Sequence, residues 1–184
     1  MNPINKTNAR AQQIAALKAY PTAQRERETA QLVAQLTAMP AWRNAQTIAT
    51  TISGPFEVAT AGIIAAAQSG GKQVLLPKVM PKRQMAFMPY TGKDDLVRSH
   101  FGLLEPAYDA ATVNNEPDLV VVPGLAYAMD THLRLGFGGG YYDRFLAKYR
   151  GVSVSLALPV QTNVTAFWPT EDFDIPLQNI ITIK

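Results

Sequence analysis

A glycine-rich segment in the last third of the chain carries residue types suited to binding phosphate. Residues 134–143 read Arg-Leu-Gly-Phe-Gly-Gly-Gly-Tyr-Tyr-Asp and lead directly into a helix-like stretch. Glycine lets a ligand approach backbone amides closely, and a helix N-terminus adds free N–H donors and a partial positive charge. Arg134 could add a charge-assisted bond to a phosphate oxygen, and Asp143 could be an oxygen ligand for Mg²⁺ on that phosphate.

The segment differs from the two common phosphate-loop motifs. No Gly-Lys-Ser/Thr follows the glycines, and we expect no strand immediately before them, as the dinucleotide-binding fingerprint requires. Taken alone, a glycine cluster is also typical of an ordinary loop, and Asp143 could be only a favourable charge at a helix start. The combination of glycines, Arg134 and Asp143 favours phosphate binding.

The elements that would position this segment alternate between helical and strand-like patterns. Helical periodicity covers residues 5–19, 22–39, 57–68 and 141–149. Apolar or β-branched runs predict strands at residues 46–53, 73–77, 85–88, 119–122, 152–158 and 180–183. This alternation predicts an α/β fold with a largely parallel sheet. We expect one domain over residues 1–184, with residues 1–40 forming an N-terminal helical arm packed on it.

Composition narrows the class of protein. The chain has 184 residues, 47% hydrophobic and 17% charged, and no cysteine. This composition is globular, and it excludes disulfides and thiolate metal sites. No apolar run approaches the roughly 20 residues of a membrane span, and the N-terminus lacks a signal-peptide core. We therefore expect a cytoplasmic monomer with no membrane partner.

Charge is spread unevenly although the formal net charge is only +3. Basic residues gather in 1–43, 72–98 and 134–150, whereas residues 105–130 carry acids and no base. A nucleic-acid binder more often shows one continuous basic stripe with aromatic residues, so we expect no nucleic-acid partner. The pattern suits an anionic small molecule held from several segments, or simply scattered solvated side chains.

Several sequence elements, taken in order, resemble one known family. The most specific is Val-Pro-Gly at 122–124 followed by Arg-Leu-Gly-Phe-Gly-Gly-Gly-Tyr-Tyr-Asp-Arg-Phe-Leu at 134–146. The weaker ones are Lys6 and Arg10, Glu57, Gly-Lys at 71–72 with Leu-Pro-Lys at 76–78, Gly-Leu-Leu-Glu-Pro at 102–106, and Asp174 through Thr182. Together they resemble the 5-formyltetrahydrofolate cyclo-ligase (5,10-methenyltetrahydrofolate synthetase) family over nearly the whole chain, which implies a three-layer α/β/α fold.

The resemblance implies an enzyme that closes 5-formyltetrahydrofolate, with or without a polyglutamate tail, to the 5,10-methenyl form. ATP would be consumed, Mg²⁺ would be required, and ADP and phosphate would be released. A formamide carbonyl is a poor electrophile, so phosphorylation of the formyl oxygen would create a leaving group before the N10 amine attacks. Positioning and charge neutralisation should supply most of the rate, and no thiol is needed.

The resemblance also implies roles for the charged residues and the glycine loop. Lys6 and Arg10, which share a helix face, would hold ATP phosphates, although a solvated helix face also explains them. Asp143 and Asp174 would be the Mg²⁺ ligands, with Asp172 a competing candidate for the second position. The residues implied to bind the nucleotide in the loop are Arg134, Leu135, Gly136, Phe137, Gly138, Gly139, Gly140, Tyr141 and Tyr142; of these, Arg134 and Tyr141 are the implied catalytic residues.

For the folate, the resemblance implies a separate set. Glu57 would accept hydrogen bonds from pterin N–H groups, although it could equally be a helix-start charge. Ile52 would be an apolar contact, and Phe137 and Tyr141 could border the pterin. Ordinary packing in the core or of the loop explains these three residues as well.

The chain departs from the family pattern in two places. The family usually has Phe-Asp-x-x-Gly-x-Arg before the glycine loop, whereas residues 127–134 read Tyr-Ala-Met-Asp-Thr-His-Leu-Arg, one residue longer and without that glycine. The acid usually found four residues after the Asp174 position is Gln178 here. We expect the only two histidines, His100 and His132, to be surface or loop residues rather than catalysts.

Two alternatives remain open at this point. A non-catalytic nucleotide-binding paralogue could keep the glycine loop, and the altered residues 128–133 are compatible with it. A sugar-phosphate enzyme of similar architecture would keep the phosphate loop but would not depend on Glu57.

Overall fold

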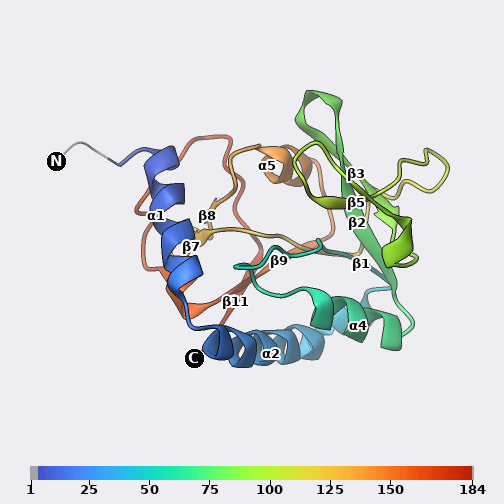
Figure 1. Ribbon diagram of the computed structural model, residues 1–184, viewed down its shortest axis with the longest axis horizontal. Helices are drawn as coiled ribbons and strands as arrows, with labels where there is room; N and C mark the ends of the chain where they lie inside the picture. The colour runs from blue at the N-terminus through green and yellow to red at the C-terminus, as the bar shows by residue number, and fades with distance from the viewer. Residues whose placement is uncertain (1–3, 184) are drawn as a thin grey trace.

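A six-stranded sheet forms the centre of the computed structural model, which describes residues 4–183 (Figure 1). Its strand order is β11-β9-β6-β1-β2-β3, and neighbouring strands pair in parallel except β2 and β3, which form an antiparallel hairpin. The strands span Thr47–Ala49 (β1), Gln73–Met80 (β2), Gln84–Pro89 (β3), Leu119–Val121 (β6), Val152–Ala157 (β9) and Asn179–Thr182 (β11). The predicted α/β class with a largely parallel sheet is confirmed.

Helices lie on both sides of this sheet: α2 and α4 cover one face, and α5 lies on the other (Figure 1). The α-helices span Lys6–Ala19 (α1), Thr22–Ala38 (α2), Pro40–Asn44 (α3), Ala61–Ser69 (α4) and Tyr141–Leu146 (α5). Short 3₁₀ helices span Pro81–Arg83 (η1), Lys93–Asp95 (η2) and Pro159–Gln161 (η3). The arrangement is the three-layer order implied by the sequence.

Side chains along the central strands alternate between two buried faces of the sheet. Ile48 belongs to a core cluster with Leu32 and Ile63 of α2 and α4, while the next residue, Ala49, belongs to a second cluster with Leu146 of α5. Successive side chains of a strand point to opposite faces, so the sheet is buried on both sides. This explains why β6 appears in the sequence as a continuous apolar run rather than an alternating one.

The two N-terminal helices contribute directly to the core. Ala9 and Leu17 of α1, with Leu32 and Leu36 of α2, are at most 1% exposed and join the cluster beneath the sheet. Asn5 caps α1 by accepting a hydrogen bond from the Asn8 backbone N–H at 2.8 Å. The first helices of the predicted arm therefore pack on the sheet; residues 1–3 and 184 of the predicted domain lie outside the described residues.

The segment after β1 differs from the prediction. The expected strand 46–53 ends at Ala49, and the expected helix 57–68 begins only at Ala61, so Glu57 lies in the intervening turn and is not a helix-start charge. Gly54 and Pro55 interrupt both patterns, and a Pro removes a ladder donor while fixing φ. The chain is thus free to form a loop at the end of β1.

Several short elements were not predicted. A hairpin of Leu96–Arg98 (β4) and Leu104–Pro106 (β5) projects beside β2, and a small sheet joins Thr162–Asn163 (β10), Ala126–Ala128 (β7) and Arg134–Leu135 (β8). Because β8 directly precedes the glycines, the expectation that no strand lies there is wrong. A two-residue strand shows no periodicity in a sequence, which is why it was missed.

Within residues 4–183, no helix is long and apolar enough to cross a membrane.

Candidate functional site

A pocket opens at the carboxyl ends of β1, β6 and β9. The connection after β1 leads to β2 and the connection after β6 leads to β9, on the opposite side of the sheet. Open α/β sheets bind ligands in the crevice at such a point. The pocket is open to solvent, and the space around its lining residues is about 400 Å³ when that open solvent is included. Its polar lining residues are Thr50, Thr51, Ser53, Glu57, Thr60, Tyr127 and Gln161.

Glu57 is held in this pocket by the loop that follows β1. Its Oε2 accepts a hydrogen bond from the Gly54 backbone N–H. Ser53 and Thr60 close the loop through two reciprocal bonds of 3.1 Å, each side-chain oxygen accepting from the other residue's N–H. Burial raises the pKa of Glu57, and the Gly54 bond opposes that rise. The sheet therefore presents a partly desolvated carboxylate, a suitable acceptor for ligand N–H groups.

Tyr127 lines the same pocket from β7, and sequence reasoning missed it. A Cβ at Gly124 would lie 2.9 Å from the Tyr127 hydroxyl, so the glycine of Val-Pro-Gly is needed for the ring to pack there. Burial raises the pKa of Tyr127 to about 12, partly offset by the Arg134 charge, while the Glu57 carboxylate adds to the rise. Tyr127 also pairs with Arg134 across β7 and β8, so the pocket adjoins the start of the glycine loop.

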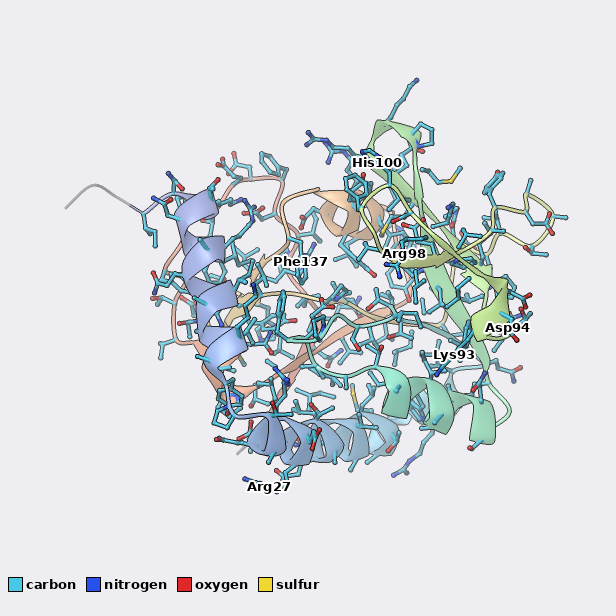
Figure 2. The ribbon with its side chains drawn as sticks, viewed as in Figure 1. Arg27, Lys93, Asp94, Arg98, His100 and Phe137 are labelled. Atoms are coloured by element: carbon cyan, nitrogen blue, oxygen red, sulfur yellow. The ribbon has the colours of Figure 1, made fainter. Side chains whose placement is uncertain are left out.

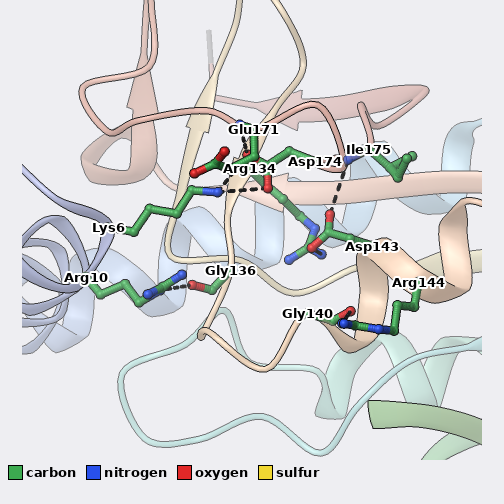
Figure 3. Close-up of polar contacts among 10 residues, drawn as sticks. All are labelled: Lys6, Arg10, Arg134, Gly136, Gly140, Asp143, Arg144, Glu171, Asp174 and Ile175. Carbon is green, nitrogen blue, oxygen red and sulfur yellow. Dashed lines mark hydrogen bonds and ion pairs between the residues drawn. The ribbon is translucent and has the colours of Figure 1, made fainter. Parts of the chain in front are cut away.

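The predicted phosphate-binding residues converge at one corner of the molecule (Figure 3). Lys6 of α1 donates to both carboxylate oxygens of Asp174, at 2.9 and 2.8 Å. Arg10, one turn later on the same helix, donates from Nε to the Gly136 carbonyl oxygen at 2.8 Å. Segments separated by more than 120 residues thus meet here, and the shared helix face of Lys6 and Arg10 is turned toward the glycine loop.

Arg134 lies at the start of the loop, in β8, with its side chain only 4% exposed. One guanidinium N–H donates to Asp143 Oδ2 at 3.2 Å, the guanidinium lies 5.5 Å from the Tyr142 ring centre, and Nε is buried without a partner. A Cβ at Gly136 would lie 2.5 Å from Arg134 Nη1. Buried unpaired donors are uncommon, and a role in binding a ligand is one explanation for them.

The remaining glycines shape the turn into α5. Gly138 and Gly140 have φ of +108° and +68°, values that side chains rarely adopt. A Cβ at Gly139 would lie 2.5 Å from the Tyr141 ring. The loop therefore needs glycine at these positions for backbone reasons and for the close approach of an aromatic ring.

The two candidate metal ligands share this corner. Asp143 Oδ1 accepts a hydrogen bond from the Ile175 N–H at 3.3 Å, and Ile175 directly follows Asp174, so this bond links the two aspartates. Asp174 Oδ2 accepts another from the Glu171 N–H at 2.9 Å. Asp172 is exposed, unlike Asp174. In the described part of the chain, no three His, Asp or Glu residues gather to hold an ion by themselves. Two carboxylates suit Mg²⁺, which usually completes its shell with water and substrate phosphates.

Gln178, the second departure from the family pattern, lies away from these aspartates. Its Oε1 accepts from the Ser153 N–H at 3.1 Å, and its Nε2 donates to the Gly151 carbonyl at 3.3 Å. The side chain needs both an acceptor and a donor, which an amide supplies and a carboxylate does not. The Gln178 side chain therefore holds the main chain at the start of β9.

The aromatic candidates lie in two environments. Phe137 is 48% exposed on the loop (Figure 2) and Tyr141 is half-buried, with the ring of Phe101 from the β4–β5 hairpin 6.5 Å from it, edge to face. Phe101, 60% exposed, was not singled out from the sequence. Tyr142, in contrast, is buried beneath Arg134.

Two predicted residues are placed mainly by the core. Leu135 is 1% exposed, and its carbonyl oxygen accepts from the Leu125 N–H at 2.8 Å. Ile52 packs half-buried against the main core cluster. Its side chain lies next to, rather than among, the pocket-lining residues, so core packing accounts for its position.

A largely parallel sheet, with a glycine-rich loop and a pocket containing Glu57 at its carboxyl edge, defines an α/β protein whose geometry suits a phosphorylated ligand. Comparison with known proteins is more specific. The model of the 5-formyltetrahydrofolate cyclo-ligase family matches residues 3–183, and the chain belongs to that family.

Individual relatives agree with the family assignment. The chain is 32% identical over 144 residues to a 5-formyltetrahydrofolate cyclo-ligase of Haemophilus influenzae, covering 76% of each chain. Among solved structures, it is similar to the 5,10-methenyltetrahydrofolate synthetase of Aquifex aeolicus, with a TM-score of 0.82, 26% identity, and coverage of 96% of this chain and 89% of that one. The Mycoplasma pneumoniae synthetase shares the fold, with a TM-score of 0.75 at 20% identity over 97% and 98% of the chains.

Proposed function

We propose that this chain catalyses the ATP-dependent ring closure of 5-formyltetrahydrofolate to 5,10-methenyltetrahydrofolate, with release of ADP and phosphate. The observation that carries the proposal is the meeting of Lys6, Arg10 and Arg134 around the glycine loop, beside a pocket that holds Glu57. Membership of the cyclo-ligase family supports the same reaction.

ATP would bind at the corner built by α1 and the glycine loop. Lys6 and Arg10 supply positive charge from the helix, Arg134 supplies further N–H donors, and the backbone of residues 136–140 can approach the phosphates closely. Asp143 and Asp174 would hold Mg²⁺ in place of their present partners, Arg134 and Lys6, which would then turn to the phosphates. Bound Mg²⁺ neutralises phosphate charge during transfer.

The folate would bind across the pocket at the end of β1. Glu57 can accept two N–H groups of the pterin together, one on each carboxylate oxygen. Phe137 and Tyr141 would cover the ring from the glycine loop, where an aromatic face can stack on the pterin. This arrangement would bring the formyl group close to the terminal phosphate of ATP.

The chemistry then depends on position rather than on a protein nucleophile. The formyl oxygen attacks the γ-phosphorus and ADP leaves, which turns that oxygen into part of a phosphate leaving group. The N10 amine attacks the activated formyl carbon, loses its proton, and phosphate departs as the ring closes. Arg134 would stabilise the charge that develops on the transferred phosphoryl group, and Tyr141 would shield the reacting atoms from water.

A component-omission assay tests this function. Purified protein is mixed with 5-formyltetrahydrofolate, ATP and Mg²⁺, and each component is left out in turn while the methenyl product is measured by chromatography. We expect product only when all three are present. Tight ATP binding without any folate product would favour a non-catalytic nucleotide-binding paralogue, and turnover of a sugar phosphate instead would favour the other alternative. We further propose that the enzyme is a cytoplasmic monomer. The same preparation can be used to measure its oligomeric state, and to compare turnover of 5-formyltetrahydrofolate with and without a polyglutamate tail.

A further inference from the structure

His132 adopts a backbone conformation that is unusual for a residue with a side chain. Its φ is +58°, in the left-handed region that favours glycine, and it lies two residues before Arg134, where the family pattern has the glycine of Gly-x-Arg. The missing glycine therefore leaves the turn itself intact: a histidine occupies the same kind of position at a cost in strain. Strain of this kind persists only where surrounding contacts hold it.

Two hydrogen bonds join His132 to Leu177. The His132 carbonyl oxygen accepts from the Leu177 N–H at 3.0 Å, and ring Nδ1 lies 3.1 Å from the Leu177 carbonyl oxygen. Since a carbonyl can only accept, Nδ1 carries the hydrogen and donates it. Leu177 is itself 2% exposed in the core cluster beside α5, so its main chain is a firm attachment point.

The segment that His132 binds, residues 174–177, includes Asp174, a proposed Mg²⁺ ligand of the nucleotide site. Asp174 lies three residues before Leu177, and between them the Ile175 N–H donates to Asp143 Oδ1 at 3.3 Å. On the other side of His132, the chain runs through Leu133 to Arg134, which bonds Asp143 at 3.2 Å. His132 thus links the strand that presents Arg134 to the segment that presents Asp174.

We propose that His132 is a positioning residue, whose ring holds the 174–177 segment in register with β8 so that Asp143, Asp174 and Arg134 meet the Mg²⁺–ATP complex together. The expected effect on the KM for Mg²⁺–ATP rests on the proposed function, whereas the expected effect on the 174–177 segment does not. A glycine at this position would form the turn without the ring bond, and this chain adds that bond.

The test compares His132→Gly with His132→Asn. Glycine relieves the strain and removes the ring bond, and we expect the KM for Mg²⁺–ATP to rise about three- to tenfold, the factor expected for one lost hydrogen bond, while the melting temperature changes little. Asparagine tolerates positive φ and keeps a side-chain N–H donor, so it should restore part of the affinity. Lys82→Gly is the matched control, since Lys82 has φ of +57° at the exposed tip of the β2–β3 hairpin; its KM should be unchanged.

Hydrogen exchange of the backbone amides separates this inference from the proposed function. In nucleotide-free protein, the Leu177 and Ile175 amides should exchange at least threefold faster in His132→Gly than in the unmodified chain or in Lys82→Gly. Equal exchange and an equal KM in His132→Gly would overturn the positioning role. If the unmodified chain does not use ATP at all, the proposed function fails, but the exchange result still decides the role of His132.

Discussion

At the scale of single residues, Arg134 and Glu57 occupy adjoining sites with different chemistry. Arg134 is buried, carries an unpaired Nε and contacts Asp143, while Glu57 is held in the adjoining pocket with a raised pKa. We propose that Arg134 acts on phosphate and that Glu57 accepts hydrogen bonds from N–H groups of the folate. Substitutions should therefore affect the two substrates separately.

Replacement of Arg134 tests the phosphate side. Arg134→Lys keeps the charge but loses the planar fork, so we expect kcat/KM for ATP to fall roughly 100-fold with little change in the KM for folate. Steady-state kinetics with each substrate varied in turn gives the two values. Arg150→Lys, an exposed position, is the control; equal losses in both variants would show that the effect is unspecific.

Replacement of Glu57 tests the folate side. Glu57→Gln keeps the shape but loses an acceptor, and we expect the folate KM to rise about tenfold or more while ATP binding is unchanged. Glu26→Gln, exposed on α2, should leave both parameters unaltered. An unchanged folate KM in Glu57→Gln would count against the assignment of the pocket.

The pKa of Glu57 also predicts a pH dependence. Because burial raises this pKa, the carboxylate should be lost on acidification at a higher pH than the usual value of about 4.3 for glutamate. The folate KM of the unmodified chain should therefore begin to rise before ordinary carboxylates titrate, and the rise should be absent in Glu57→Gln. A pH profile of the folate KM that is identical in both proteins would refute this.

The charged residues of the candidate site could be predicted from the sequence, whereas the neighbouring residues that orient them could not. Lys6, Arg10 and Asp174 could be predicted because charge and family spacing mark them. The structure brings Lys6 into contact with Asp174, and Arg10 into contact with the glycine loop. Tyr127 and His132 could not, since one depends on a close approach to Gly124 and the other on a positive φ. Such dependence on a three-dimensional neighbour leaves no local pattern.

At the scale of elements, the unit that matters is β8, the glycine loop and α5. The strand of two residues and the helix of six are both too short to be stable alone, and the contacts of Arg10 with Gly136 and of Asp143 with Ile175 hold them in place. The central strands could be predicted because they are rich in apolar and β-branched residues. β8 could not, because tertiary pairing alone defines it.

A methyl group in the loop should disturb function more than stability. In Gly136→Ala the new Cβ would meet Arg134 Nη1 at 2.5 Å and displace the guanidinium, so we expect kcat/KM for ATP to fall about tenfold or more with a modest change in melting temperature. Gly92→Ala is the matched control, because its backbone is extended and a methyl group there would meet open space. An active Gly136→Ala variant would show that Arg134 need not keep this place.

At the scale of the whole molecule, the candidate site and a set of stabilising hydrogen bonds lie at opposite edges of the sheet. The pocket lies at the carboxyl edge, whereas at the amino edge Asp118 accepts three hydrogen bonds, from Gln46 N–H at 2.8 Å and from the Thr47 N–H and hydroxyl at 2.9 Å each. These bonds join the start of β1 to β6. They should affect folding without touching the site.

Asp118→Ala should accordingly lower the free energy of unfolding by about 1 kcal/mol at pH 7, a modest value because the side chain is exposed. The bonds from Thr47 and Gln46 lower the pKa of Asp118, so its contribution is complete above the unfolded value of about 3.9 and is lost as pH falls through the lowered folded value. Urea unfolding from pH 7 to pH 3, with Asp94→Ala as the exposed control, measures it. A difference that persists undiminished in acid would contradict this sign.

The most direct test of the central claim is the stoichiometry of a single reaction mixture. With 5-formyltetrahydrofolate limiting and Mg²⁺ and ATP in excess, ADP and methenyl product are quantified from the same samples. We expect one ADP for each methenyl product, with neither formed when folate is omitted. ADP release that does not depend on folate, or folded and ATP-binding protein that yields no methenyl product, would contradict it.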